Sequence, residues 1–140
     1  MSQVSRMIRL PVEASTLWSE IGSFSNIAQW HPMLADVESQ GDWPGAVRLA
    51  HTRDGQTQIE RLESIDPEEH VYRYTMEATV MPIENYRAEF RIEDNHDHSS
   101  TLCWSARFDV LDYSENAEAM VDAFLEAGID NLHQRYGTRH

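Results

Sequence analysis

The chain has 140 residues, which is the length of one ordinary domain. Its composition, 41% hydrophobic and 25% charged, is that of a folded globular protein and excludes a disordered or fibrous chain. Twenty-four acidic residues outnumber eleven basic ones, all of them arginine, which gives a net charge of −13. This negative charge argues against nucleic-acid binding and against docking on an anionic membrane surface.

The single cysteine, Cys103, has no partner for an internal disulfide or a structural zinc site. Residues 1–15 contain no long apolar run, so we expect neither a signal peptide nor membrane insertion, and the cytoplasm is the default location. No repeat, low-complexity tract or linker divides the sequence, which predicts a single domain over residues 1–140.

The first predicted elements are a strand and short helical segments. Residues 4–10 have the composition of a strand that ends at Pro11. Residues 14–21 place apolar side chains at helical spacing, and Gly22 is a plausible stop. A turn that contains Trp30-His31-Pro32 follows, and a second short helix is expected in this part of the chain.

Residues 34–110 have the pattern of about six consecutive strands, because turn signals break this stretch at regular intervals. The breaks are residues 41–45, Asp54-Gly55, Asp66-Pro67, Met81-Pro82 and residues 94–100. Short connections between successive strands favour an antiparallel meander.

The C-terminal segment predicts a long helix. Ser114 is the expected N-cap, with Glu115 and Glu118 in the first turn, where the helix dipole favours acids. Apolar residues then recur at helical spacing: Ala117, Met120, Val121, Phe124, Leu125, Gly128, Ile129, Leu132 and Tyr136. Such a wide apolar stripe needs a sheet to cover it. The order of elements therefore predicts an α+β helix-grip fold, a curved antiparallel sheet of about seven strands around this helix. The space between them is either a ligand pocket or filled by side chains.

Two turn types compete at the Asp54-Gly55 hairpin. A two-residue turn would pair Leu49 with Glu60, whereas a three-residue loop with Gly55 in a bulge would pair Arg48 with Glu60. We prefer the second turn, because it places opposite charges across from each other. It puts Ala46, Arg48, Ala50, Gln58, Glu60 and Leu62 on one face, although apolarity alone would favour burying the other face.

The sequence resembles bacterial SRPBCC proteins of the START/Bet v1-like superfamily, often described as polyketide cyclase/dehydrase-like, over nearly its whole length. The residues that carry the resemblance are Trp18, Trp30-His31-Pro32, Gly45, Arg48, Asp54-Gly55, Glu60-Arg61-Leu62, Asp66, Asn85-Tyr86, Trp104-Ser105-Ala106 and Phe108. A more distant similarity to the plant abscisic acid receptors rests on Arg48, Glu60-Arg61-Leu62 and Asn85-Tyr86. The superfamily includes binders, transporters, cyclases and hydrolases, so the resemblance specifies the fold more than the function.

The resemblance implies a cavity lining. Glu60 and Tyr86 would supply polar groups, with His31 and Arg48 close by. The walls would be Ala50, Gln58, Tyr74, Met76, Ala88, Trp104, Met120 and Phe124. His31 stands where the receptors carry a lysine for a ligand carboxylate, and a tight hairpin replaces their longer gate loop, so the hormone-receptor function is not carried over.

Three residues are candidates for proton transfer. Glu60 is either a ligand anchor or general base, or the partner of Arg48 in a cross-strand pair. Tyr86 either donates to a ligand oxygen or reaches solvent at the sheet edge. His31 could act as acid, base or ligand donor, or be a packed structural residue.

The apolar turn Met81-Pro82-Ile83 predicts either a lid over the cavity mouth or a contact in a homodimer. His96 and His98 lie in an expected exposed hairpin without a third ligand, so we expect no metal site. No nucleotide-binding or hydrolase motif occurs, and no cofactor is predicted.

The sequence thus predicts a protein that binds a small, largely apolar organic molecule as a carrier or sensor. A cyclase or dehydratase that uses Glu60, Tyr86 and His31 for proton transfer is the alternative. A packed module whose Met81–Ile83 turn contacts a partner protein is a third possibility.

Overall fold

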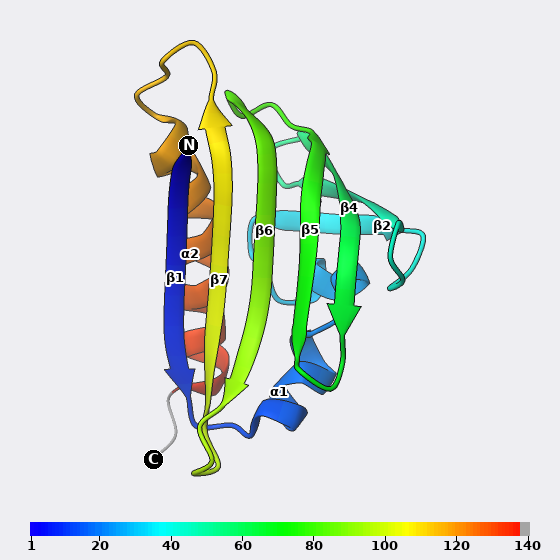
Figure 1. The fold of residues 1–140 in the computed structure, drawn as a ribbon, viewed down its shortest axis with the longest axis vertical. Coiled ribbons are helices and arrows are strands. Elements are labelled where there is room, and N and C mark those ends of the chain that lie inside the picture. Colours follow the sequence, from blue (N-terminus) through cyan, green and yellow to red (C-terminus); the bar gives the residue numbers. More distant parts are fainter. Residues whose placement is uncertain (138–140) are drawn as a thin grey trace.

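The computed structural model describes residues 1–137 and shows a seven-stranded antiparallel sheet beside a long C-terminal helix (Figure 1). The elements in chain order are β1 (Ser2–Leu10), α1 (Ala14–Ile21), the 3-10 helix η1 (Phe24–Gln29), β2 (Leu34–Ser39), β3 (Val47–Thr52), β4 (Thr57–Asp66), β5 (Val71–Ala78), β6 (Ile83–Asp94), β7 (Ser100–Val110) and α2 (Ala117–Tyr136). The strand order β1-β7-β6-β5-β4-β3-β2 is a six-strand meander that β1 extends beside β7. The predicted α+β helix-grip fold is confirmed.

Helix α2 runs along β1 and β7 on the inner side of the curved sheet (Figure 1). Its buried residues are Ala117, Val121, Phe124, Leu125, Gly128, Ile129 and Leu132, all of which belong to the predicted stripe. Two further predicted members are not buried, since Met120 is 41% exposed and Tyr136 is half-buried. On its polar side Arg6 of β1 donates to both carboxylate oxygens of Asp122, at 2.7 and 2.6 Å. Although α2 has 20 residues, neither it nor any other helix within residues 1–137 is long and apolar enough to cross a membrane.

The helix starts later than the sequence predicted. Ser114 lies in a turn in which its backbone N–H donates to the Leu111 carbonyl, and Asp112 and Tyr113 adopt positive φ angles of 53° and 52°. Ser114, the expected N-cap, is part of this turn and does not cap the helix. The N-cap is instead Asn116, whose side chain makes no capping hydrogen bond.

The preferred hairpin register is confirmed. Arg48 pairs with Glu60 and Ala50 with Gln58, and Gly55 has a φ of 90°, as a bulged three-residue loop requires. The face that carries these residues is buried, although it is the more polar of the two. Charge pairing across β3 and β4 therefore predicted the buried face better than apolarity did.

Candidate functional site

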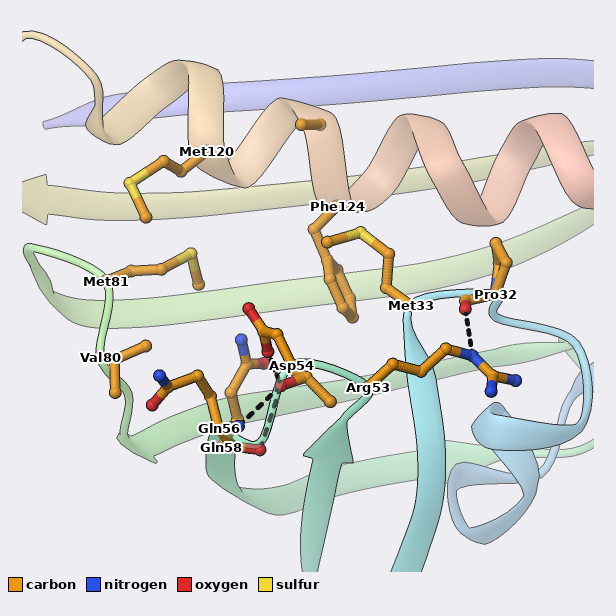
Figure 2. A pocket seen from close by; sticks show the side chains of 12 residues that line it. Pro32, Met33, Arg53, Asp54, Gln56, Gln58, Val80, Met81, Met120 and Phe124 are labelled. Atoms are coloured by element: carbon orange, nitrogen blue, oxygen red, sulfur yellow. Dashed lines mark hydrogen bonds between the residues drawn. The ribbon is translucent and has the colours of Figure 1, made fainter.

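An apolar pocket with a volume of about 510 Å³ lies between the tip of the β3–β4 hairpin, the loop before β6 and the first half of α2 (Figure 2). Its apolar lining residues are Pro32, Met33, Val80, Met81, Met120, Ala123 and Phe124. Its polar lining residues, Thr52, Arg53, Asp54, Gln56 and Gln58, all belong to the hairpin. The pocket therefore has an apolar side and a polar side.

The hairpin side of the pocket is tied to the segment before β2. The backbone N–H of Arg53 donates to the Met33 carbonyl at 3.0 Å, and its Nε donates to the Pro32 carbonyl at 2.8 Å. Thr52 accepts from the Gln56 backbone N–H through its hydroxyl at 2.9 Å and donates to the Asp54 carboxylate. These bonds connect the hairpin to residues 32–33 and brace its tip.

The opposite side comes from α2 and from the loop between β5 and β6. Met120, Ala123 and Phe124 are three and four residues apart, so they share one face of the helix. Val80 is 60% exposed, Met33 42% and Met120 41%, so the mouth presents apolar side chains to solvent. An exposed apolar rim around a concave site is typical of a ligand-binding or interaction surface.

His31, a candidate acid, base or ligand donor, is 1% exposed and held at both ring nitrogens. The Met33 backbone N–H donates to Nδ1 at 3.2 Å, so Nε2 carries the proton that is donated to the Phe124 carbonyl at 2.7 Å. Burial lowers the pKa of His31 to about 4, against the opposing effect of the bond to Phe124. The neutral ring stacks on Phe124 with 4.0 Å between centroids, and it supports the pocket wall from behind.

Glu60 and Arg48 form a buried ion pair rather than part of the pocket lining. Arg48 Nε donates to Glu60 Oε1 at 2.9 Å, and the two side chains are 0% and 4% exposed. Arg48 Nη1 also donates to the Phe24 carbonyl at 2.6 Å. Burial by itself lowers the pKa of Arg48, but Glu60, Tyr72 and Tyr74 together outweigh this effect, so the pKa lies above the ordinary arginine value. The geometry is that of a structural cross-strand pair.

The remaining predicted wall residues pack in the interior or face another part of the surface. Trp104 Nε1 donates to the Tyr74 hydroxyl at 3.1 Å, and Trp104 is in edge contact with His31. Burial raises the pKa of Tyr86 above its ordinary value. Tyr86 and Met76 line a separate surface hollow of about 590 Å³.

Ala50 is 1% exposed and Ala88 is 5% exposed, and neither lines the pocket. Aromatic side chains therefore fill much of the interior space in which the resemblance implied a ligand cavity. Of the predicted lining, the pocket contains Gln58, Met120 and Phe124.

Only part of the predicted lid reaches the pocket. Met81 lines it, together with its neighbour Val80. Ile83 is instead the first residue of β6, where it pairs with Val110 and is 5% exposed. The carbonyl of Pro82 accepts from the Leu111 backbone N–H at 2.8 Å, which ties this loop to the end of β7.

Sequence reasoning missed several lining residues, notably Met33, Val80 and Asp54. A signal for each was present, since Met33 follows the turn at Pro32, Val80 extends the apolar turn at Met81, and Asp54 forms the hairpin tip. The two histidines of the β6–β7 hairpin form separate contacts: His98 Nδ1 lies 2.6 Å from Glu13, and His96 lies 3.8 Å from Asp94. Within residues 1–137, no three His, Cys, Asp or Glu side chains are placed to hold a metal ion together.

Comparison with solved structures shows which proteins share this fold. An uncharacterized protein from Bacillus thuringiensis is 23% identical, with a TM-score of 0.89 over 98% of this chain and 100% of that one. The protein XoxI from Bacillus cereus is 24% identical, with a TM-score of 0.90 and full coverage of both chains. The Bet v1-like structure of Ara h 8.0201 has a TM-score of 0.75 at 14% identity, over 96% of both chains. These similarities establish the fold.

The family follows from the sequence itself. No curated protein matches the chain. The family model described as polyketide cyclase/dehydrase and lipid transport matches residues 1–137. The chain therefore belongs to the polyketide cyclase/dehydrase and lipid transport family, within the SRPBCC superfamily that the sequence resemblance indicated.

Proposed function

We propose that the protein binds a small, largely apolar organic molecule in the pocket lined by Met33, Met81, Met120 and Phe124, and acts as a carrier or sensor. The observation that carries this proposal is the pocket itself, whose volume of about 510 Å³ falls within the range of small-molecule sites. Its apolar residues come from three separate segments of the chain that the fold brings together. Membership of a family that includes lipid transport supports the same conclusion.

Binding fits the site better than catalysis does. Neither His31 nor Glu60 nor Tyr86 lines the pocket, and general acid–base chemistry needs the group within hydrogen-bond reach of the substrate. His31 is neutral with both nitrogens engaged, and Glu60 is paired with Arg48. The polar residues at the pocket are suited to orienting a ligand. A cytoplasmic location and the absence of a nucleic-acid partner stay predictions from the sequence.

A fluorescence titration with N-phenyl-1-naphthylamine, a neutral apolar probe, tests this function. We expect a saturable rise in emission with one probe per chain. Met120→Glu places a carboxylate at the pocket and should weaken binding by about tenfold or more, because the charge is costly beside an apolar ligand.

The matched control is Met7→Glu, which adds the same charge at a residue on β1 that is 67% exposed and lies outside the pocket. Its affinity for the probe should equal that of the unmodified protein. Emission that does not saturate, or an equal loss of affinity in both variants, would contradict binding in this pocket.

A further inference from the structure

Gln58 stands at an unusual place in the pocket wall. It lies on the inner face of β4 and is only 5% exposed. Across the sheet it pairs with Ala50 of β3, whose small side chain does not cover it. Strand β5 ends at Ala78, opposite Ile59, so the chain beside Gln58 is the loop that carries Val80 and Met81. The Gln58 side chain therefore has the pocket as its neighbour.

The carboxamide of Gln58 has no hydrogen-bond partner within residues 1–137. Two other side-chain amides do find partners: Gln40 Oε1 accepts from the Val47 N–H at 3.0 Å, and Asn131 Nδ2 donates to the Trp30 carbonyl at 2.6 Å. This amide faces the open pocket, so a ligand that fills the pocket removes it from solvent. A ligand oxygen that pairs with the amide avoids leaving it unsatisfied.

The charges of the protein determine which ligand charge the pocket favours. Arg53 donates through Nε to the Pro32 carbonyl, and the Asp54 carboxylate lies on the same side of the pocket as Gln58. The whole chain carries a net charge of −13, so its electrostatic potential opposes the approach of an anion. A neutral ligand avoids this repulsion.

We propose that Gln58 is the specificity-determining residue of the pocket, and that it recognises the carbonyl or hydroxyl oxygen of a neutral, otherwise apolar ligand. This inference rests on the proposed function and assigns its ligand class. A carboxamide can donate to a carbonyl and can accept from a hydroxyl, so both groups satisfy it. Hydrocarbons leave it unsatisfied, and carboxylate anions meet the unfavourable potential of the protein.

Three naphthalene derivatives of similar size test the inference by competition with N-phenyl-1-naphthylamine. They are 2-acetylnaphthalene, which has a carbonyl, 2-ethylnaphthalene, which has none, and 2-naphthoate, which is an anion. We expect the ketone to bind about tenfold more tightly than the ethyl compound, the ratio that one hydrogen bond to a buried group can provide. The anion should bind most weakly, and its affinity should rise with salt as the repulsion is screened.

Gln58→Met keeps the length of the side chain and removes the amide. The variant should bind 2-ethylnaphthalene at least as well as the unmodified protein does, and its preference for the ketone should fall to about twofold or less. The matched control is Gln3→Met, because Gln3 is an exposed glutamine on β1 that lies outside the pocket. This control should retain the preference for the ketone.

The outcomes separate the two proposals. If the unmodified protein binds the ketone and the ethyl compound equally well, the role proposed for Gln58 is wrong, while the proposed function of the pocket still holds. This comparison requires no variant. A ketone preference that survives in Gln58→Met would also overturn that role. Failure of both neutral compounds and of the probe to bind would instead contradict the proposed function.

Discussion

The space between the sheet and α2 has two regions that differ in packing. Toward the middle of α2, Trp30, His31, Phe90 and Trp104 form a continuous aromatic cluster, with ring centroids 5.5–5.9 Å apart along its contacts. Near the start of α2, aliphatic and methionine side chains surround an open pocket (Figure 2). Methionine is flexible and fills irregular shapes, whereas aromatic rings in contact have few alternative positions.

This difference indicates that one region stabilises the fold and the other is available for binding. The aromatic cluster fixes the distance between helix and sheet, and His31 connects it to α2 through the Phe124 carbonyl. Phe124 belongs to both regions, because it stacks on His31 and also lines the pocket. A fixed interior can hold the mouth open without a ligand, which suits a protein that takes up and releases apolar molecules.

The largest expected effect comes from breaking the buried ion pair of Arg48 and Glu60. Glu60→Ala leaves the fully buried Arg48 without its carboxylate, which should lower the free energy of unfolding by about 3–5 kcal/mol in a urea titration. The affinity for N-phenyl-1-naphthylamine should change little, because Glu60 does not line the pocket.

Glu77→Ala is the matched control, since it removes the carboxylate of an exposed cross-strand pair with Arg61. Its effect on stability should be much smaller. A Glu60 variant that keeps its stability but loses the probe would place Glu60 in the binding site and contradict the structural role.

A pH titration addresses the aromatic region. The folded pKa of His31 is about 4 and its ordinary value is 6.5, so the unfolded chain takes up a proton first as the pH falls. The neutral His31 ring therefore favours the folded state fully above pH 6.5. As the pH falls from 6.5 to 4, the free energy of unfolding should decrease by about 3 kcal/mol. His31→Gln should show a correspondingly smaller loss of stability over this range in denaturant titrations. Identical pH dependences would mean that His31 has the same pKa in the folded and the unfolded protein, which would contradict its burial as a neutral ring.

Gly128 tests how closely α2 approaches the aromatic cluster. A Cβ at this position would lie 2.9 Å from atoms of His31, Trp30 and Trp104. Gly128→Ala should therefore destabilise the protein by about 1–3 kcal/mol, although the same change in an exposed helix stabilises by about 1 kcal/mol. A urea titration that shows a gain in stability would contradict the close packing of this region.

The sequence predicted the sheet and the helical stripe well, because both follow from periodicity and local turn chemistry. The Arg48–Glu60 register was predictable because a charge pair across two strands is decided by residues close in sequence. The start of α2 could not be predicted in this way. Asp112 and Tyr113 form a turn with positive φ angles just before the helix, and nothing in their residue types indicates such a turn.

The site was predicted less completely than the fold. Alternation along a strand shows which side chains point inward, but the remaining volume depends on how rings from different strands pack together. Trp104 and Tyr74 point inward as predicted, yet they fill the interior. The open volume lies instead beside loops, at Met33 and Val80, whose positions depend on long-range contacts such as the bonds from Arg53.

The division between a packed interior and an open mouth is tested most directly by the methyl groups of the six methionines, labelled with 13C and followed by NMR. Met33, Met81 and Met120 line the pocket, whereas Met1 and Met76 line the separate hollow and Met7 lies outside both. Titration with N-phenyl-1-naphthylamine should shift the resonances of Met33, Met81 and Met120 saturably and leave the other three in place. Shifts confined to Met1 and Met76, or no saturable shift at all, would contradict the account.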